Sequence, residues 1–217
     1  MNKVIKSLLK YSEAGLFFAL LLACYHIASQ SAEISELKAA QTESTAAQYA
    51  LHKERTELAT WIMEKNRDIP QIVALQWADS MQRAAATYGV PLDVFRKLSI
   101  VESGTAQITP KGWNMRRFYK CSNEGQPLTS CAGAVGIYQV MPFWAKQCPE
   151  ARHSRDLREP AINIYCGAYV LSHYLKQYKS MEYALTAYNG GPRAVNLLLQ
   201  GRDITNGYAK KVLGQVI

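Results

Sequence analysis

Apolar residues recur at intervals of three and four along most of the chain, and this spacing is typical of amphipathic helices. From residue 70 onward, several of the predicted helices begin near a proline or end at a glycine, as helices commonly do. No segment alternates apolar and polar residues over a length that would predict a β-strand. A short β-hairpin within residues 104–134 is the one alternative to an all-helical unit. The pattern therefore predicts a mainly α-helical unit over residues 70–217, with helices at about 70–88, 91–103, 159–178, 180–191, 191–201 and 205–217.

Residues 31–69 differ from this unit because they are polar, rich in alanine and free of glycine and proline. Their few apolar residues fall on a spacing of three and four, but polar residues share the same register, so the seam is only half apolar. We interpret this segment as a helical stalk, which is either a weak coiled coil or a solvated helical spacer. Both forms would hold the following domain away from a membrane.

Residues 1–30 have the charge pattern of an export signal or a membrane anchor. Three lysines precede an uncharged run from Ala14 to Ser31, and a basic segment before such a run is typical of both. The most apolar part ends in the sequence LLAC, which resembles the lipobox of bacterial lipoproteins and makes Cys24 a candidate for lipidation. The alternative is an uncleaved membrane helix. Both predict a membrane-tethered protein whose remaining residues lie in the periplasm or another extracytoplasmic space.

The composition excludes few classes of protein. The chain has 217 residues, 48% of them hydrophobic, and a formal net charge of +8. Such a charge attracts anionic partners, among them nucleic acids, membrane surfaces and acidic wall polymers. The basic residues are scattered, however, and no zinc-finger, helix-turn-helix or RNA-recognition pattern is evident. We therefore expect no nucleic-acid partner.

Four cysteines remain when Cys24 is set aside, and an even number in an exported chain favours disulfides. Four cysteines allow three pairings. The simplest joins neighbours along the chain, Cys121 with Cys131 and Cys148 with Cys166. Their spacing is not that of a structural zinc site, so no metal is expected. Four reduced thiols are the alternative.

A carboxyl group ends an apolar run in the sequence LSIVESG. Glu102 there lies beside apolar residues, where burial costs free energy unless the acid is paired or protonated. Burial raises the pKa of a carboxyl group, and a carboxyl group that is protonated near neutral pH is suited to general acid catalysis. The alternative is a surface acid at the end of a helix.

Four short motifs follow one another along the chain: VESG at 101–104, GAVGIYQVMP at 133–142, ALTAYNGGP at 184–192 and GYAKKV at 207–212. Each is weak alone, but in this order, and after an export-type N-terminus, they resemble the lytic transglycosylases with a lysozyme-like fold. The resemblance covers roughly residues 91–212 and implies a lysozyme-like, mainly α catalytic domain that acts on peptidoglycan.

The same resemblance implies a role for residues of each motif. Glu102 would be the single catalytic acid, and Ser103 would help to position it or the N-acetyl group of the substrate. Gly136 would let the backbone approach the sugar closely. A tyrosine hydroxyl would orient the carboxyl group, and no metal or cofactor is implied. The other substrate-binding residues would be Gln139, Met141, Tyr188, Asn189 and Tyr208.

Such an enzyme cleaves the β-1,4 bond between N-acetylmuramic acid and N-acetylglucosamine and leaves a 1,6-anhydromuramoyl end. No second carboxylate has the apolar setting of Glu102, which favours attack by the muramoyl 6-hydroxyl over attack by water. Glu124, in an inserted loop, is the first candidate for a second base. The rival interpretations are a goose-type lysozyme-like hydrolase and a non-catalytic wall-binding or assembly protein. Glycan strands and the membrane are the expected partners, with secretion, conjugation or phage machinery as candidates.

The segment between Glu102 and Gln139 is about twice the length that is usual in these enzymes, and its excess falls within residues 110–131. Aromatic residues there would suit sugar stacking, and basic residues would suit the carboxylates of stem peptides. A disulfide-pinned loop without a catalytic role fits the sequence equally well. The residues concerned are Trp113, Phe118, Tyr119, Arg116, Arg117 and Lys120.

Overall fold

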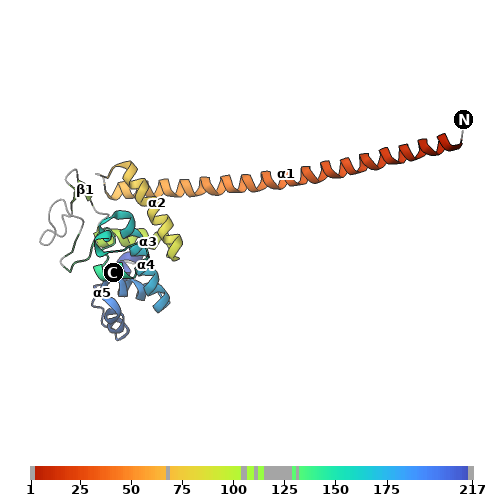
Figure 1. Cartoon of the computed structure of the whole chain (residues 1–217). Coiled ribbons are helices and arrows are strands. Elements are labelled where there is room, and N and C mark those ends of the chain that lie inside the picture. The colour runs from red at the N-terminus through yellow and green to blue at the C-terminus, as the bar shows by residue number, and fades with distance from the viewer. Residues whose placement is uncertain are drawn as a thin grey trace. The chain divides into compact units, whose positions relative to one another are not determined.

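The chain divides into two compact units, Met1–Lys53 and Glu54–Ile217. A single helix, α1 (Lys3–Lys65), makes up the first unit and contributes its last turns to the second (Figure 1). Leu58 and Ile62 in those turns are buried in the core of the second unit. The globular unit therefore includes the end of the segment that the sequence predicts as a stalk. The structure is a computed structural model, which describes residues 3–66, 69–103, 107–109, 112–114, 129–130 and 132–214.

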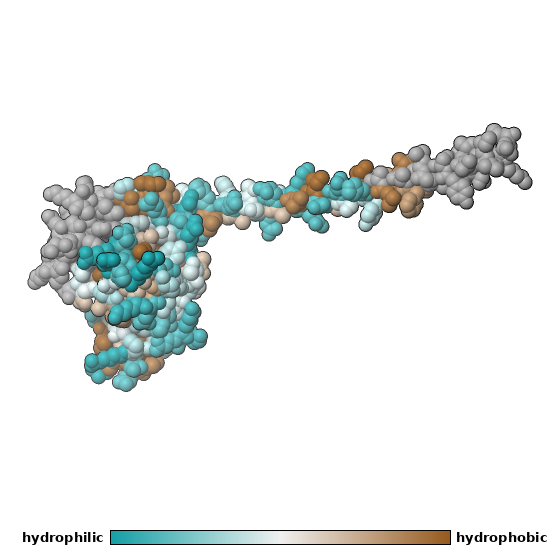
Figure 2. Space-filling view, in the orientation of Figure 1, coloured by the Kyte–Doolittle hydropathy of each residue, from teal (hydrophilic) through white to brown (hydrophobic). Residues whose placement is uncertain are grey.

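The N-terminal part of α1 exposes apolar side chains at several positions between Phe17 and Ile27, visible as brown residues along the helix in Figure 2. A membrane-spanning helix, one of the two forms predicted for residues 1–30, is not found: within the described ranges no helix is both long and apolar enough to cross a membrane. The apolar part, 14–24, is shorter than the stretch of about 20 residues that a spanning helix needs. Cys24 is an exposed free cysteine.

The globular unit is mainly helical, as predicted. α2 follows Pro70 and ends at Gly89, whose φ of 64° closes the helix in the left-handed conformation. The sequence predicts two short helices that meet at Gly191, and this is confirmed: α5 spans both, but its backbone is non-helical at Gly191, where the chain kinks. The elements are α2 (Gln71–Tyr88), α3 (Leu92–Ser103), η1 (Pro142–Lys146), η2 (Ser154–Arg158), α4 (Pro160–Tyr178), α5 (Met181–Leu199) and α6 (Tyr208–Leu213).

α4 is the central helix of this unit and packs against α2 on one side and α5 on the other (Figure 1). Side chains on most of its circumference are buried, Ile164 and Leu171 completely. A helix that is apolar nearly all round is expected at the centre of a core. α6 packs against both α3 and α5, and its first residue, Tyr208, reaches the C-terminal end of α3.

Two short strands, β1 (Gln107–Thr109) and β2 (Gly112–Asn114), form an antiparallel hairpin with Ile108 opposite Trp113. This is the hairpin that the sequence leaves open within residues 104–134. One of the two predicted disulfides, Cys148–Cys166, joins the segment after η1 to α4. The other predicted pair, Cys121 and Cys131, lies outside the described residues.

Candidate active site

A cavity of about 630 Å³ opens between the end of α3, the segment before η1, α5 and α6. It brings together residues from all four sequence motifs. Six of the predicted site residues line it: Glu102, Gln139, Met141, Tyr188, Asn189 and Tyr208.

Glu102 is the acid of this cavity. It lies in the last turn of α3, a helix held in the core by Phe95 and Leu98, and Ile100 and Val101 line the cavity beside it. Burial among these groups disfavours the carboxylate and raises the pKa of Glu102 to about 7. The group is therefore partly protonated at neutral pH, which is the state that a general acid requires.

Tyr208 is the hydrogen-bond partner of this acid. Its hydroxyl group donates to Oε1 of Glu102 from the first residue of α6. Burial and the nearby Glu102 carboxylate raise the pKa of the Tyr208 hydroxyl well above its ordinary value, so it remains a donor. The bond favours the carboxylate and opposes the effect of burial on the pKa of Glu102, but burial is the larger of the two.

A tight turn carries the second motif into the cavity wall. Val135 and Val140 bond to each other through both backbone pairs at 2.9 Å, and residues 136–139 form the turn between them. Gln139 adopts a φ of 45° and donates from Nε2 to the carbonyl oxygen of Gly136 at 2.9 Å. A positive φ is uncommon for a residue other than glycine and is most frequent at functional or tightly constrained positions.

Asn163, a completely buried residue of α4, holds this turn in place. Its Oδ1 accepts a hydrogen bond from the backbone N–H of Tyr138 at 2.9 Å. Its Nδ2 donates to the carbonyl oxygens of Val135 and Leu157, at 2.8 Å and 3.0 Å. Every bond of the amide goes to backbone, so Asn163 fixes where the turn lies against α4.

Tyr138 connects the turn to two other walls of the cavity. Its ring stacks on that of Phe95 in α3, with centroids 4.2 Å apart, and its hydroxyl group donates to the Phe95 carbonyl oxygen at 3.2 Å. Its own carbonyl oxygen accepts from the hydroxyl group of Tyr188 at 2.7 Å. Gly167 of α4 makes room for the ring, because a Cβ there would lie 2.6 Å from it. Tyr138 thereby fixes the distance between α3, α4 and α5.

Two predicted site residues do not line the cavity. A Cβ on Gly136, whose φ is 79°, would lie 2.4 Å from the side chain of Asn163, so this glycine is needed for the packing of the turn against α4. The hydroxyl group of Ser103 donates to the carbonyl oxygen of Ser99 at 2.9 Å, within α3. Neither residue contributes to the lining.

The third motif places Tyr188 and Asn189 at the cavity just before α5 bends. Gly191 has a φ of 69° and Pro192 follows it, which interrupts the helix there. Gly190 allows the two halves to meet closely, because a Cβ at that position would lie 2.5 Å from the Cβ of Ala194. The repeated glycine of the motif therefore shapes the helix that presents the tyrosine and the asparagine.

Three other acids of the globular unit have hydrogen-bond partners outside the cavity. Glu150 accepts from the hydroxyl group of Tyr88, at 2.7 Å and 2.6 Å. Asp156 accepts from the backbone N–H groups of Arg152 and His153, and Asp203 from those of Thr205 and Gly207. Across the described part of the cavity lining, Glu102 is the only carboxyl group. Glu124 lies outside the described residues.

Sequence reasoning missed Asn163, Tyr138, Gly167 and Lys211. The first three support the cavity wall from the core. For Asn163 and Gly167, the only available signal was an asparagine or a glycine inside a helical pattern. Lys211 lines the cavity from α6, three residues after Tyr208. Its signal was the helical spacing to Tyr208, which puts the two residues on one face.

Over the described ranges, one group of side chains has the donor set for a metal ion: Cys148, Glu150 and Cys166. The two cysteines are joined as a disulfide, so their sulfur atoms are not available as thiolate ligands.

Residues 79–207 match the Transglycosylase SLT domain family. Because the match spans more than half of the chain, the protein belongs to this family, as the four motifs predict. A curated relative, a transglycosylase of Enterobacteria phage PRD1, is 31% identical over 124 residues, which is 57% of this chain and 38% of the relative.

Two solved structures are similar to the chain, each at 20% identity. An inactive mutant of the lytic transglycosylase Slt from Pseudomonas aeruginosa matches 72% of this chain with a TM-score of 0.49. The 70 kDa soluble lytic transglycosylase from Escherichia coli matches 77% with a TM-score of 0.48. The matched region is 28% of each of those chains, so this protein spans a minor part of the length of these relatives.

Proposed function

We propose that this protein is a peptidoglycan lytic transglycosylase with Glu102 as its single catalytic acid. One observation carries the proposal: a carboxyl group with a pKa of about 7 faces a 630 Å³ cavity and is held by a tyrosine hydroxyl. A surface acid at a helix end would have neither the apolar surroundings nor the buried donor. Membership of the Transglycosylase SLT domain family supports the same reaction.

In the proposed reaction, the substrate is the β-1,4 bond between N-acetylmuramic acid and N-acetylglucosamine. Protonated Glu102 donates its proton to the glycosidic oxygen as the bond to the muramoyl C1 breaks. The N-acetyl group of the muramoyl residue stabilises the positive charge that develops at C1. The Glu102 carboxylate then removes a proton from the 6-hydroxyl, whose oxygen bonds to C1. The 1,6-anhydromuramoyl product forms and Glu102 regains its proton.

The choice of an internal nucleophile rests on the lining of the cavity. A hydrolase of the inverting or retaining kind uses a second carboxyl group across the cleft, and Glu102 has no such partner among the lining residues that the structure describes. The 6-hydroxyl is attached to the substrate and is favoured over water by proximity. Gln139, Met141, Tyr188 and Asn189 line the same cavity and would bind the sugar.

Digestion of purified peptidoglycan in oxygen-18 water, followed by mass analysis of the fragments, tests the proposal. We expect anhydromuramoyl ends without the heavy label. Labelled reducing ends would instead indicate a goose-type lysozyme-like hydrolase, and Glu124 would be the next residue to substitute. A folded Glu102→Gln variant keeps the size of the side chain but loses the proton, and we expect its rate to fall by about 10²–10⁴-fold. Wild-type rates from that variant would disprove the role of Glu102.

A non-catalytic wall-binding protein is the rival from another class. It would bind glycan strands with equal affinity in the wild type and in Glu102→Gln, and neither would release fragments. An acid with a raised pKa has no use in such a protein, because holding a buried carboxyl group costs stability. The arrangement at Glu102 therefore favours the enzyme.

We propose, in addition, that the domain acts outside the cytoplasm and is tethered through residues 1–30. The support is the basic segment before the uncharged run, the exposed apolar side chains of α1 and the exposed thiol of Cys24. Labelling with a fatty acid, compared between the full chain and a Cys24→Ala variant, distinguishes a lipid anchor from attachment by the helix alone. The phage origin of the curated relative makes phage machinery the first partner to test, ahead of secretion or conjugation machinery.

A further inference from the structure

We infer that Lys211 binds a carboxylate group carried by the lactyl substituent of a muramoyl residue, and that it is a specificity-determining residue of the cavity. This inference rests on the proposed function, since it concerns the same substrate. The carboxylate has two chemical sources: the stem peptide attached to the lactyl group, or the free lactyl carboxylate that remains when the peptide has been removed.

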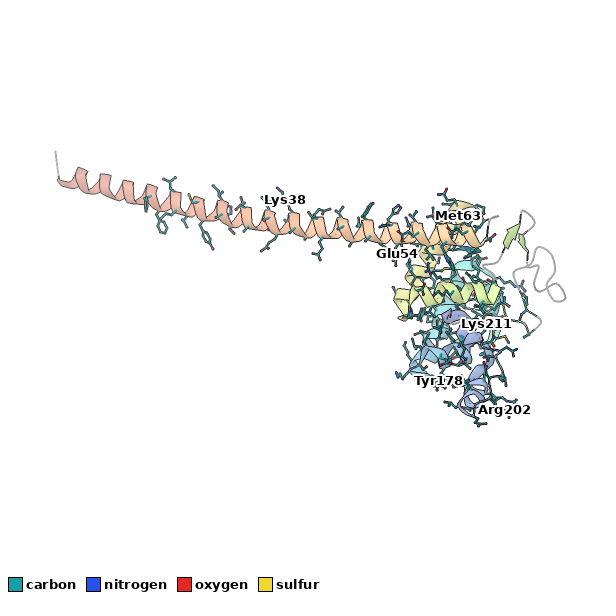
Figure 3. The ribbon with its side chains drawn as sticks, turned by 180° about the vertical axis from the view of Figure 1, so that it is seen from behind. Lys38, Glu54, Met63, Tyr178, Arg202 and Lys211 are labelled. Atoms are coloured by element: carbon teal, nitrogen blue, oxygen red, sulfur yellow. A yellow bond between two sulfur atoms is a disulfide. The ribbon has the colours of Figure 1, made fainter. Side chains whose placement is uncertain are left out.

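The position of Lys211 is the first observation. It lies on α6 (Figure 3), one helical turn after Tyr208, and both residues line the cavity that holds Glu102. Residues three apart share a face of a helix. The helix that orients the acid through Tyr208 thus also brings an ammonium group to the same cavity.

The charge of the cavity is the second observation. Of the described residues in its lining, Lys211 is the only basic one and Glu102 the only acidic one. Because Glu102 is largely protonated below pH 7, the cavity then carries a net positive charge. Within the part of the chain that the structure describes, the exposed side chain of Lys211 has no hydrogen-bond or ion-pair partner that would neutralise it.

The chemistry of the substrate selects the carboxylate. The sugar rings and N-acetyl groups of a glycan strand are neutral, so an ammonium group gains little from them beyond a hydrogen bond. A carboxylate on the lactyl substituent offers a full opposite charge close to the bond that is cleaved, and charge-assisted hydrogen bonds are stronger than neutral ones. Because Lys211 is exposed, solvent screens this pair and the expected effect is moderate, about three- to fivefold in kcat/KM.

The neighbouring residue provides a matched control. Lys210 is on the same helix and is also exposed, but it does not line the cavity. Its charge instead acts on Asp203, whose pKa is lowered mainly by hydrogen bonds from Thr205. Lys210→Gln removes the same charge from the same helix without changing the cavity.

The experiment measures kcat/KM of the full chain and of Lys211→Gln, Lys211→Arg and Lys210→Gln on three soluble glycan strands. The first strand carries stem peptides, the second has been freed of peptides and bears lactyl carboxylates, and the third carries stem peptides whose carboxylates are all converted to amides. We expect Lys211→Gln to lose about three- to fivefold on at least one strand with free carboxylates and nothing on the amidated strand. Lys211→Arg and Lys210→Gln should remain within about twofold of the wild type.

The two sources are separated by the first two strands. A loss confined to the peptide-bearing strand assigns the carboxylate to the stem peptide, and a loss on the peptide-free strand assigns it to the lactyl group. Equal losses on all three strands, or no loss on any, would overturn the inference. Failure of the wild-type protein to cleave every strand would reject the proposed function itself, which is a different result.

Discussion

The hydroxyl group of Tyr208 donates a hydrogen bond to the carboxyl group of Glu102, although 106 residues separate the two in the sequence. Glu102 is near the C-terminal end of α3 and Tyr208 is the first residue of α6. Gly207, with a φ of 69°, turns the chain immediately before Tyr208. Two opposed effects therefore act on the pKa of Glu102: burial raises it, and the hydrogen bond from Tyr208 lowers it.

The pH dependence of the reaction should follow the protonation of Glu102. A general acid must carry its proton, and the pKa of Glu102 is about 7. We therefore expect kcat/KM to be constant below that value and to fall about tenfold per pH unit well above it. Initial rates on soluble glycan strands between about pH 5 and pH 9 measure this profile. Rates that stay level to pH 9 would contradict the assignment of the acid.

Glu102→Gln should make the folded protein more stable at high pH while it removes activity. Because the pKa of Glu102 is raised from 4.5 to about 7 by folding, the folded state binds the proton more tightly than the unfolded state. The contribution of Glu102 to wild-type stability is therefore highest below about pH 4.5 and is lost as the pH rises through 7, a change of about 3 kcal/mol for a shift of this size. Glutamine carries no charge, so the variant does not lose this stability as the pH rises.

Denaturant unfolding at pH 4 and at pH 8 measures the effect. We expect the difference in unfolding free energy between Glu102→Gln and the wild type to move in favour of the variant by up to about 3 kcal/mol between these conditions. Substitution of an exposed acid, Glu182→Gln in the first turn of α5, is the control and should show no such change. A difference that is the same at both pH values would rule out a raised pKa.

Tyr208→Phe should raise the pKa of Glu102 further and slow the reaction. The lost hydrogen bond favours the carboxylate, so its removal moves the alkaline limb of the rate profile to higher pH. Loss of an orienting contact should lower kcat by about tenfold. Tyr188→Phe is the matched comparison, because its hydroxyl group bonds to the carbonyl oxygen of Tyr138 instead.

For Tyr188→Phe, we expect a loss of about 1–3 kcal/mol in unfolding free energy, since a buried carbonyl group loses its partner, with the alkaline limb unmoved. If Tyr208→Phe left the limb in place, or moved it to lower pH, Tyr208 would not control the acid.

The Cys148–Cys166 disulfide should stabilise the globular unit. It closes a loop with a sequence separation of 18, for which the chain-entropy estimate is about 3 kcal/mol. A Cys148→Ala/Cys166→Ala variant should therefore unfold at a lower denaturant concentration than the oxidised wild type. A reducing agent should lower the stability of the wild type more than that of the variant, which lacks this disulfide but keeps Cys121 and Cys131. Equal stability of wild type and variant before reduction would contradict the prediction.

Gly136 and Gly133 should respond differently to alanine although both have a positive φ, 79° and 87°. A Cβ on Gly136 would collide with the side chain of Asn163 at 2.4 Å, whereas a Cβ on Gly133 would meet nothing within 4 Å. Gly133→Ala should cost about 1 kcal/mol from backbone strain alone. Gly136→Ala should cost at least about 3 kcal/mol, because it also breaks the hydrogen bonds of Asn163. Thermal unfolding of both variants makes the comparison, and equal costs would exclude the collision.

The sequence by itself predicted which residues line the cavity around Glu102. Helical spacing predicted the helices of the globular unit, because the periodicity of apolar residues in an amphipathic helix is a local property of the sequence. The apolar run before Glu102 predicted an acid with a raised pKa, and the four motifs predicted the family. The break within residues 180–201 was predicted in the same way, because Gly191 ends the first of two short helices and its backbone is non-helical.

Only the tertiary structure decided how these residues meet. Tyr188 and Tyr208 were equal candidates to orient Glu102 in the sequence, and the packing of α6 against α3 selects Tyr208. Gly136 was expected to face sugar, yet it faces Asn163, whose place in the core depends on where α4 crosses the turn. Contacts of this kind join residues far apart in the chain. They follow from the packing of the whole core, to which every helix contributes, and no local pattern records them.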